Sequence, residues 1–375
     1  MGGSRLKIAV LTSSRADYGI YLPLLHLMQT DPGIELSIIA FGSHLKEQFG
    51  NTIDQIKNDG FKIGAEIDNL KFGDTPEEIA LNYGHTAMLF ADFWAKHKSD
   101  YVLCLGDRYE MAAAVNAGIP FGITYAHLHA GETSEGAIDN IYRDQITLAS
   151  KYHFVAIESF ISRVETITNS NGTAFYSGAI GLENINSIDF LNIEDFNTKW
   201  GIDFSMKTLL VTVHPETINP SSNHQKIEEL KAALDYLLTK IQVLVTMPNA
   251  DTLGSLYREM FEDLKIQHGQ NVYLIENLGT QSYFSAMKLA SLLFGNTSSG
   301  IIEAASFGKY VINIGDRQKG RAHGENVIQA PFNRKQLINL TEEHMGKIYS
   351  GPNIYKLDEG SDIIIKILKE KLNGI

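Results

Sequence analysis

The sequence predicts an α/β protein built from two doubly wound domains. Short apolar runs rich in β-branched residues alternate with segments whose apolar residues recur at helical spacing. Such runs indicate parallel strands buried on both faces, because the connecting helices cover the sheet from either side. The series occurs twice in a chain of 375 residues, a length suited to two domains of average size.

The two series are read as follows. The first has predicted strands at 7–12, 36–42, 101–107, 122–130 and 152–157. Helical spacing predicts helices between them at 22–28, 76–97 and 141–150. The second has predicted strands at 208–215, 243–248, 272–277, 291–296 and 310–316.

The boundary between the domains is predicted within residues 177–207, which are rich in Asn, Asp, Ser and Gly and show no long period. We place it near Gly181, so that the first domain is 1–180 and the second is 181–355. Residues 356–375 have helical apolar spacing. We expect them to form a final helix that packs back on the first domain.

The composition excludes several classes of protein. Lys and Arg number 32 against 44 Asp and Glu, and the formal net charge of −12 argues against nucleic acid or an anionic membrane as a partner. The apolar run near the start, "KIAVLT", is too short for a signal-peptide core, and no apolar stretch approaches the length of a membrane span. The single cysteine, Cys104, excludes a disulfide framework and a cysteine zinc site. We expect a cytoplasmic protein.

Ligands of doubly wound sheets bind at the carboxyl ends of the strands, and the cleft between two such domains is the default site. The first strand is followed by "TSSRADYG", with Arg15 and Asp17. A dinucleotide-binding G-x-G-x-x-G is absent at this point, which disfavours an NAD-dependent enzyme.

Titratable residues gather after two later strands of the first series. Asp107 in "GDRYE" fits a helix cap as well as a functional carboxylate. The segment "HLHAGETSEGAIDN" favours function, because histidines and carboxylates at this density supply proton acceptors and donors near neutral pH. Its titratable residues are His127, His129, Glu132, Glu135 and Asp139.

A metal site is the rival interpretation of this segment. His127 and His129 alternate on one strand face, and Glu132 or Asp107 could join them as ligands. The sequence has no fixed-spacing zinc signature such as H-E-x-x-H. We therefore expect no metal.

The second series ends its strands in polar turns that carry His214, Asn249 and Asp251. In "GNTSSGIIEAASFG", the hydroxyls from Thr297 onward suit either a helix cap or an anion cradle. Basic residues follow at Arg317, Lys319 and Arg321, and arginines facing a helix start favour a diphosphate. Glu303, one turn into the helix, suits hydrogen bonds from two ribose hydroxyls.

Several of these segments resemble the hydrolysing UDP-N-acetylglucosamine 2-epimerases, which begin sialic-acid-type sugar synthesis. The matching segments are "SRADYG", "GDRYE", "HAGE", "AIDN", "HP", "PNAD" and, the most specific, "GNTSSGIIEAASFGKYVINIGDRQKGRAHGENVI". They occur in the family's order over nearly the whole chain.

The resemblance implies the GT-B architecture, two Rossmann-like domains facing a cleft, with the nucleotide held mainly by the second domain. The implied reaction converts UDP-N-acetylglucosamine and water to N-acetylmannosamine and UDP. It proceeds by elimination to 2-acetamidoglucal and hydration with inversion at C2, without a cofactor. Dimers are common in the family, so we expect a homodimer or a higher homo-oligomer.

The resemblance also implies residue roles. The family's acid–base carboxylates match Asp107 and Asp139, and a histidine of the same cleft matches His214. The diphosphate would be bound by Arg15, Thr297, Ser298, Ser299, Gly300 and Arg317. Glu303 matches the ribose-binding glutamate, and the uracil would rest near Leu278, Gly279 and Tyr283.

One departure from the family pattern affects the chemistry. Many relatives have H-x-E where this chain has His127-Leu128-His129, so either His129 or Glu132 takes over the proton transfer. The departure also leaves the sugar open, since related bacterial enzymes act on UDP-2,4-diacetamido-2,4,6-trideoxyglucose in the legionaminic acid pathway. A GT-B glycosyltransferase or a UDP-sugar binding protein without chemistry would use the same nucleotide cleft.

Overall fold

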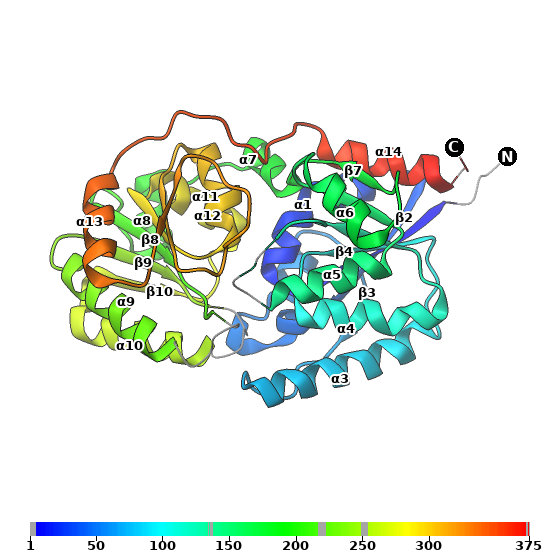
Figure 1. Ribbon diagram of the computed structural model, residues 1–375, viewed down its shortest axis with the longest axis horizontal. Coiled ribbons are helices and arrows are strands. Elements are labelled where there is room, and N and C mark those ends of the chain that lie inside the picture. Colours follow the sequence, from blue (N-terminus) through cyan, green and yellow to red (C-terminus); the bar gives the residue numbers. More distant parts are fainter. Residues whose placement is uncertain are drawn as a thin grey trace. The chain divides into compact units, whose positions relative to one another are not determined.

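The computed structural model describes residues 5–133, 135, 138–216, 223–248, 254–372 and 374, and these fall into two compact units (Figure 1). The first unit comprises the described residues of Met1–Glu132, Asp139–Ser187 and Tyr355–Ile375. The second comprises those of Thr133–Ile138 and Ile188–Ile354. The division after Ser187 lies beyond the boundary predicted near Gly181, because Asn184 donates a 2.7 Å hydrogen bond to the Gly19 carbonyl and so stays with the first unit.

The first unit is centred on a parallel sheet that has seven strands among its described residues, in the order β3-β2-β1-β4-β5-β6-β7. The strand order reverses between β1 and β4, and ligands of doubly wound sheets bind at such a switch point. The strands are β1 (Leu6–Thr12), β2 (Ile34–Phe41), β3 (Ile63–Ile67), β4 (Tyr101–Leu105), β5 (Tyr125–Leu128), β6 (Tyr152–Val155) and β7 (Ala174–Tyr176).

Helices cover both faces of this sheet, and the alternation of side chains along β1 shows why. Ile8 and Val10 point into a core shared with α1, whereas Ala9 and Leu11 point into a second core with α3 and α4. The helices of the unit are α1 (Arg15–Thr30), α2 (Ile53–Asn58), α3 (Pro76–Trp94), α4 (Tyr109–Gly118), α5 (Asp139–Ala149), α6 (Phe160–Thr168), α7 (Asn184–Ser187) and α14 (Gly360–Leu372).

The helix α14 contributes to the core of the first unit although it follows the whole second unit in the chain (Figure 1). Its Ile364 and Leu368 are fully buried beside α1. An ion pair from Lys369 to Asp31, the residue that ends α1, lies beside this contact.

The second unit repeats the same topology. Among the described residues its parallel sheet has six strands in the order β10-β9-β8-β11-β12-β13, with the switch point between β8 and β11. The strands are β8 (Thr208–Thr212), β9 (Gln242–Thr246), β10 (Val272–Ile275), β11 (Leu292–Gly295), β12 (Val311–Ile314) and β13 (Val327–Ala330). The helices are α8 (Ile193–Trp200), α9 (Asn223–Leu237), α10 (Gly254–His268), α11 (Gly279–Leu289), α12 (Ser298–Ile302) and α13 (Arg334–His344).

The predicted fold class, two doubly wound α/β sheets, is confirmed. Three strands at sheet edges, β3, β7 and β13, were not predicted. These three strands are short or partly exposed and lack the longer apolar run that marks a central strand. In β3, for example, Gly64 and Glu66 interrupt the apolar residues and both are exposed.

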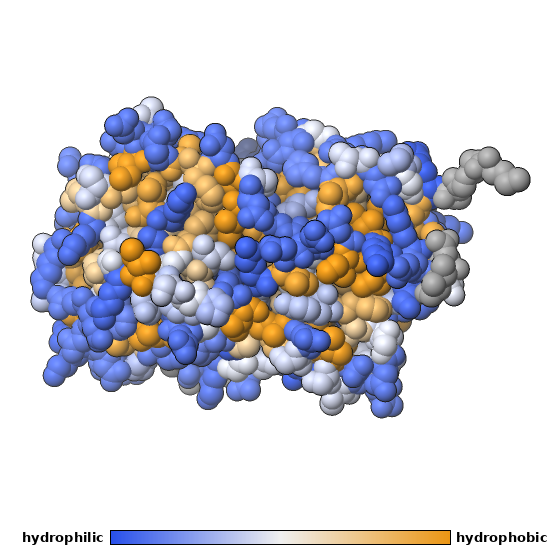
Figure 2. Space-filling view, turned by 90° about the horizontal axis from the view of Figure 1, so that it is seen from above, coloured by the Kyte–Doolittle hydropathy of each residue, from blue (hydrophilic) through white to orange (hydrophobic). Residues whose placement is uncertain are grey.

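The surface carries charged and polar residues interspersed with apolar ones on the face drawn in Figure 2. Across the described part of the chain, each helix is too short or too polar to cross a bilayer.

Gly295 at the end of β11 is required by the switch point itself. Its φ is +149°, and a Cβ placed on it would lie 1.8 Å from the Thr212 carbonyl oxygen at the end of β8. A residue with a side chain would therefore push the two strand ends apart. The glycine lets β8 and β11 pair up to the position where the turn to α12 begins.

Candidate functional site

The carboxyl ends of β4 and β5 bring acidic and basic side chains together in the first unit. Asp107 follows β4 after Gly106, a glycine with a φ of +76°. His129 follows β5 directly, and Glu132 comes three residues later. The cluster is therefore built from two neighbouring strand ends of a parallel sheet.

Arg143 of α5 lies at the centre of this cluster, and its side chain is only 1% exposed. It forms an ion pair with Asp107, and its Nη1 lies 3.4 Å from Glu132 Oε2. Nη1 also donates to the His129 carbonyl at 3.3 Å. Burial opposes the charge of Arg143, but Asp107 and Glu132 outweigh burial and raise the pKa of the guanidinium.

Arg143 was not singled out from the sequence. It lies in "IYRDQITLAS", where its spacing is that of the polar face of an ordinary amphipathic helix. A buried guanidinium is stable only when carboxylates surround it, and these come from distant positions in the chain. Asp139 begins the same helix, is half-buried and adds a favourable charge interaction with Arg143.

The ring of His129 is held by Glu132. His129 Nδ1 lies 2.6 Å from Glu132 Oε1, so the Nδ1–H tautomer donates to the carboxylate. His129 Nε2 is buried and has no hydrogen-bond partner among the residues that the structure describes. In that tautomer Nε2 carries the lone pair and is the nitrogen able to accept a proton.

His129 also has a strained backbone. Its φ is +60°, in the left-handed region that few residues other than glycine adopt. Such strain persists only where the surrounding structure enforces it, and it is concentrated at functional sites. Here the buried contacts of the ring and of the carbonyl hold the residue in place.

His127 has a structural role in the fold and does not line the cluster. Its Nε2 donates to the Gly106 carbonyl at 2.8 Å and its Nδ1 accepts from the Thr147 hydroxyl at 3.1 Å. Burial lowers the pKa of His127 to about 3, so the ring is neutral at pH 7. In the described residues no three His, Cys, Asp or Glu side chains are arranged to hold a metal ion.

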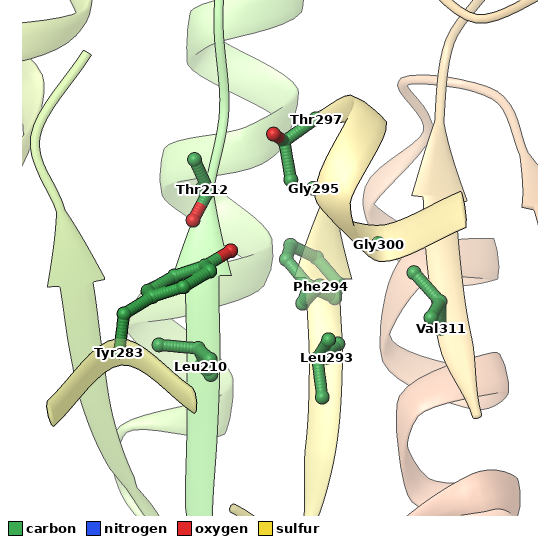
Figure 3. A pocket seen from close by; sticks show the side chains of 9 residues that line it. All are labelled: Leu210, Thr212, Tyr283, Leu293, Phe294, Gly295, Thr297, Gly300 and Val311. Carbon is green, nitrogen blue, oxygen red and sulfur yellow. The ribbon is translucent and has the colours of Figure 1, made fainter. Parts of the chain in front are cut away.

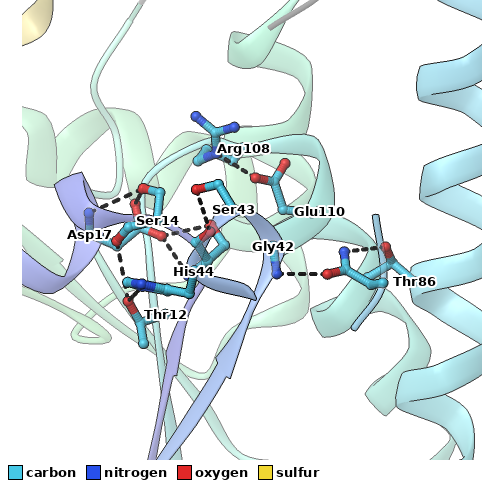
Figure 4. A network of polar contacts seen from close by, with 11 residues as sticks. Thr12, Ser14, Asp17, Gly42, Ser43, His44, Thr86, Arg108 and Glu110 are labelled. Carbon is cyan, nitrogen blue, oxygen red and sulfur yellow. Dashed lines mark hydrogen bonds and ion pairs between the residues drawn. The ribbon is translucent and has the colours of Figure 1, made fainter. Parts of the chain in front are cut away.

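The loop after β1, the strand that pairs with β4, forms a second polar network (Figure 4). Asp17 is buried and accepts from the Ser13 N–H at 2.9 Å, the Ser13 hydroxyl at 2.7 Å and the Ser14 hydroxyl at 3.1 Å. Ser14 caps α1 by accepting the Asp17 N–H. Arg15 is the first residue of α1 and is half-buried, so the network fixes the start of the helix that carries it.

Figure 4 also shows His44 and the Arg108–Glu110 pair near this loop. His44 is buried between the hydroxyls of Thr12 and Thr52, and burial lowers the pKa of its imidazole to about 3. Glu110 is fully buried, with Arg108 Nε 2.5 Å from its Oε1. Burial raises the pKa of Glu110 against the opposing effect of Arg108.

In the second unit, three strand ends are tied together through Asn296. Asn296 Oδ1 accepts the His214 N–H at 2.7 Å, and its Nδ2 donates to the His214 carbonyl at 2.8 Å. Its own carbonyl accepts from Arg317 Nη1 at 3.3 Å and from Gln318 Nε2 at 2.9 Å. The turns after β8, β11 and β12 are thus joined, and they carry His214, the start of α12 and Arg317.

The hydroxyls at the start of α12 are not used as a helix cap. Thr297 occupies the N-cap position without a side-chain capping hydrogen bond. Its hydroxyl lies 3.4 Å from Ser299 Oγ, which is also hydrogen-bonded to the Tyr283 hydroxyl. Ser298 is half-buried and Gly300 is buried. Thr297 therefore does not cap α12 through its side chain.

A pocket lies between the ends of β8 and β11 under α12 (Figure 3). The ring of Tyr283 lies across the end of β8, with its hydroxyl directed toward β11. The lining residues are Leu210, Thr212, Tyr283, Leu293, Phe294, Gly295, Thr297, Gly300 and Val311.

The residues predicted for the uracil and the ribose lie on or beside α11 and α12. Leu278 precedes α11 and packs into the core, and Gly279 follows with a φ of +67°. Glu303 ends α12 and is 7% exposed. Two residues of the turn after β9, Asn249 and Asp251, lie outside the described residues.

The chain matches known proteins along most of its length. The family model described as UDP-N-acetylglucosamine 2-epimerase matches residues 26–369. A GDP/UDP-N,N'-diacetylbacillosamine 2-epimerase (hydrolyzing) from Campylobacter jejuni is 34% identical over 88% of this chain and 85% of the relative. A UDP-N,N'-diacetylbacillosamine 2-epimerase (hydrolyzing) from Legionella pneumophila is 34% identical over 91% of this chain and 89% of the relative.

Solved structures share the fold. The UDP-GlcNAc 2-epimerase from Neisseria meningitidis, bound to UDP-GlcNAc, has a TM-score of 0.81 at 17% identity, over 97% of this chain and 100% of that one. This likeness supports the expected class of fold, two Rossmann-like units of the GT-B type.

The buried histidines predict a pH dependence of stability. His44 and His127 have pKa values lowered by burial from 6.5 to about 3, so the unfolded chain binds protons in this interval and the folded chain does not. Their stabilising contribution is complete above pH 6.5 and is lost as the pH falls toward 3. Each histidine should therefore lower the free energy of unfolding by about 1.4 kcal/mol for every unit by which the pH falls between 6.5 and 3.

Urea unfolding at pH 7 and pH 5 measures this slope. His127→Gln should lower the slope relative to the wild type, because glutamine can still donate to Gly106 but does not titrate. Substitution of the exposed His323 is the control and should leave the slope unchanged. Equal slopes for the wild type and His127→Gln would contradict the assignment.

Proposed function

Because the chain belongs to the UDP-N-acetylglucosamine 2-epimerase family and is a hydrolysing UDP-sugar 2-epimerase, we propose that its substrate is UDP-2,4-diacetamido-2,4,6-trideoxyglucose. The sugar part of this substrate is N,N'-diacetylbacillosamine. The names of both relatives at 34% identity give nucleotide-linked N,N'-diacetylbacillosamine as their substrate. The products would be UDP and the free sugar epimerised at C2. UDP-N-acetylglucosamine is the second candidate, favoured by the description of the matching family model.

The proposed reaction has two steps. A base removes the proton at C2 while the bond from C1 to the diphosphate oxygen breaks, which gives UDP and a 2-acetamidoglycal. Water then adds its oxygen to C1, and a proton returns to C2 on the opposite face. The proton at C2 is only weakly acidic, so the base must lie within hydrogen-bond reach, and the leaving diphosphate needs concentrated donors.

His129 is the proposed proton-transfer group in the first unit. Glu132 contacts His129 through one oxygen and Arg143 through the other, whereas His129 Nε2 has no hydrogen-bond partner in the described part of the chain. The observation that carries the proposal is the His129 imidazole, which Glu132 holds through Nδ1. Its Nε2 remains able to accept a proton. Glu132 would then orient the ring and stabilise its charged form, as the carboxylate of a catalytic triad does.

Asp107 and Asp139 are the proposed second acid–base pair. Arg143 connects both carboxylates with the His129 and Glu132 pair, through an ion pair to Asp107 and a charge interaction with Asp139. The side chain of Asp107 is 25% exposed, which leaves it accessible to a substrate or to water.

UDP is assigned to the second unit, with Arg15 from the first. The turn after β12 and the start of α12 supply hydrogen-bond donors for a diphosphate at the switch point of the sheet. The proposed diphosphate ligands are Arg15, Thr297, Ser298, Ser299, Gly300 and Arg317. Glu303 would accept from the ribose hydroxyls, Leu278, Gly279 and Tyr283 would hold the uracil, and His214 would lie beside the diphosphate.

Proton NMR in D2O tests the substrate. Wild-type protein is incubated with each UDP-sugar separately, without metal or acceptor. We expect the diacetamido sugar to be released with deuterium at C2 and at least 10-fold faster than N-acetylmannosamine from UDP-N-acetylglucosamine, since about 1.4 kcal/mol of differential binding suffices. A faster reaction with UDP-N-acetylglucosamine would reverse the substrate assignment, and turnover only with an added acceptor would contradict hydrolysis.

The role of Asp107 is tested by Asp107→Asn in the same assay. Loss of a positioned acid–base group should lower kcat by about 10²- to 10⁴-fold, while UDP still binds the second unit. Asp144→Asn on the same helix as Arg143 is the matched control, because Asp144 pairs with Arg163 and lies outside the cluster. A kcat near that of the wild type would remove Asp107 from the mechanism.

We also propose that the protein is a cytoplasmic homodimer or higher homo-oligomer. Exposed apolar side chains recur at helical spacing on two helices of the first unit, at Leu81 and Met88 of α3 and at Ile141 and Leu148 of α5. Residues seven apart lie on one face of a helix, so each of these helices exposes two apolar side chains on the same face. Sedimentation velocity at micromolar concentration should give a species larger than 41.6 kDa, and a monomer would contradict the proposal.

A further inference from the structure

We propose that Glu216 is a positioning residue. It holds the loop that carries Arg317 in one conformation and so orients the groups of the second unit that bind the diphosphate. This inference rests on the proposed function, since it assumes that Arg317 binds the diphosphate of UDP. Glu216 was not singled out from the sequence, where it is one of the residues of "HPET" after β8.

The carboxylate of Glu216 is buried and has two partners. The residue as a whole is 6% exposed. Its Oε1 accepts the Asp316 N–H at 2.6 Å, and its Oε2 forms an ion pair with Lys226 of α9. A charged acceptor at this distance makes a strong hydrogen bond to a backbone donor. Glu216 therefore holds the turn after β12 by its main chain.

Gly315 shows how closely the turn is fitted to this carboxylate. Its φ is +72°, and a Cβ on Gly315 would lie 2.0 Å from Glu216 Oε1. The carboxylate thus occupies the space that a side chain at this position would need. Two residues later the same turn presents Arg317.

The backbone of Glu216 is itself fixed. Asn223 at the start of α9 accepts the Glu216 N–H at 3.2 Å and donates to its carbonyl at 2.9 Å. The Tyr257 hydroxyl donates to the same amide oxygen at 3.1 Å. These hydrogen bonds fix the backbone that carries the carboxylate, and a residue that positions a binding group needs such a fixed backbone.

Arg317 is connected to the same region from its other side. Its guanidinium donates to the Asn296 carbonyl, and Asn296 pairs with both backbone groups of His214, two residues before Glu216. The loop is therefore held by Glu216 at its start and by Asn296 through Arg317. Fixing donors before the ligand arrives removes the cost of ordering them on binding.

The experiment measures UDP binding by calorimetry for the wild type, Glu216→Gln, Glu216→Ala, Arg317→Ala and the double variant of Glu216→Ala with Arg317→Ala. Glutamine keeps an oxygen that can accept the Asp316 N–H, so it serves as the conservative variant. Leu230→Val, in the core of the same unit, is the control for a general loss of stability. Thermal unfolding is recorded for each variant.

We expect Glu216→Ala to weaken UDP binding about 10-fold, the size of a lost hydrogen bond to a charged group, and Glu216→Gln to weaken it less. In the Arg317→Ala background, Glu216→Ala should cost little further affinity, because its effect acts through Arg317. Leu230→Val should lower the unfolding temperature and leave UDP affinity as in the wild type.

The outcomes separate this inference from the proposed function. Wild-type affinity in Glu216→Ala, or losses that simply add in the double variant, would overturn the positioning role while UDP binding by the wild type still stands. A loss of affinity in Leu230→Val equal to that in Glu216→Ala would overturn it as well. Failure of the wild type to bind UDP would overturn both the proposed function and this inference.

Discussion

Burial of both faces of the two parallel sheets is the constraint on which the rest of this structure depends. From Ile8 to Leu11 in β1 and from Leu209 to Val211 in β8, successive side chains enter opposite cores, and each of these positions is buried. The polar side chains of the two candidate clusters come mostly from the turns that follow the strands. In the second unit the candidate site lies at the switch point between β8 and β11, whereas in the first unit the acidic and basic cluster lies at the neighbouring ends of β4 and β5.

The turns that follow the strands are held together by ion pairs in the first unit and by hydrogen bonds of a neutral amide in the second. In the first unit, Arg143 joins carboxylates from two turns, so that the negative charges offset one buried positive charge. In the second unit, Asn296 satisfies backbone groups of neighbouring turns with a neutral amide. This amide adds no negative charge of its own beside Arg317.

The sequence predicted what depends on local pattern. Central strands such as β4 and β8 are continuous apolar runs, and the polar residues directly after them, among them Asp107 and His214, were singled out for that reason. The resemblance to the family then implied their roles. Edge strands such as β3 are partly exposed and lack the run. Arg143 and Glu216 were missed because their importance comes from burial and from partners far away in the chain. The backbone strain at His129 and the burial of its Nε2 likewise follow from the folded backbone.

The position of α14 affects how this protein can be assembled on the ribosome. Ile364 and Leu368 complete the core beside α1, yet they are synthesised only after all of residues 188–354. The second unit can therefore finish folding while the core beside α1 still lacks the buried side chains of α14. Domains usually fold in the order of their synthesis. In this chain the unit that starts first should be the last to become stable.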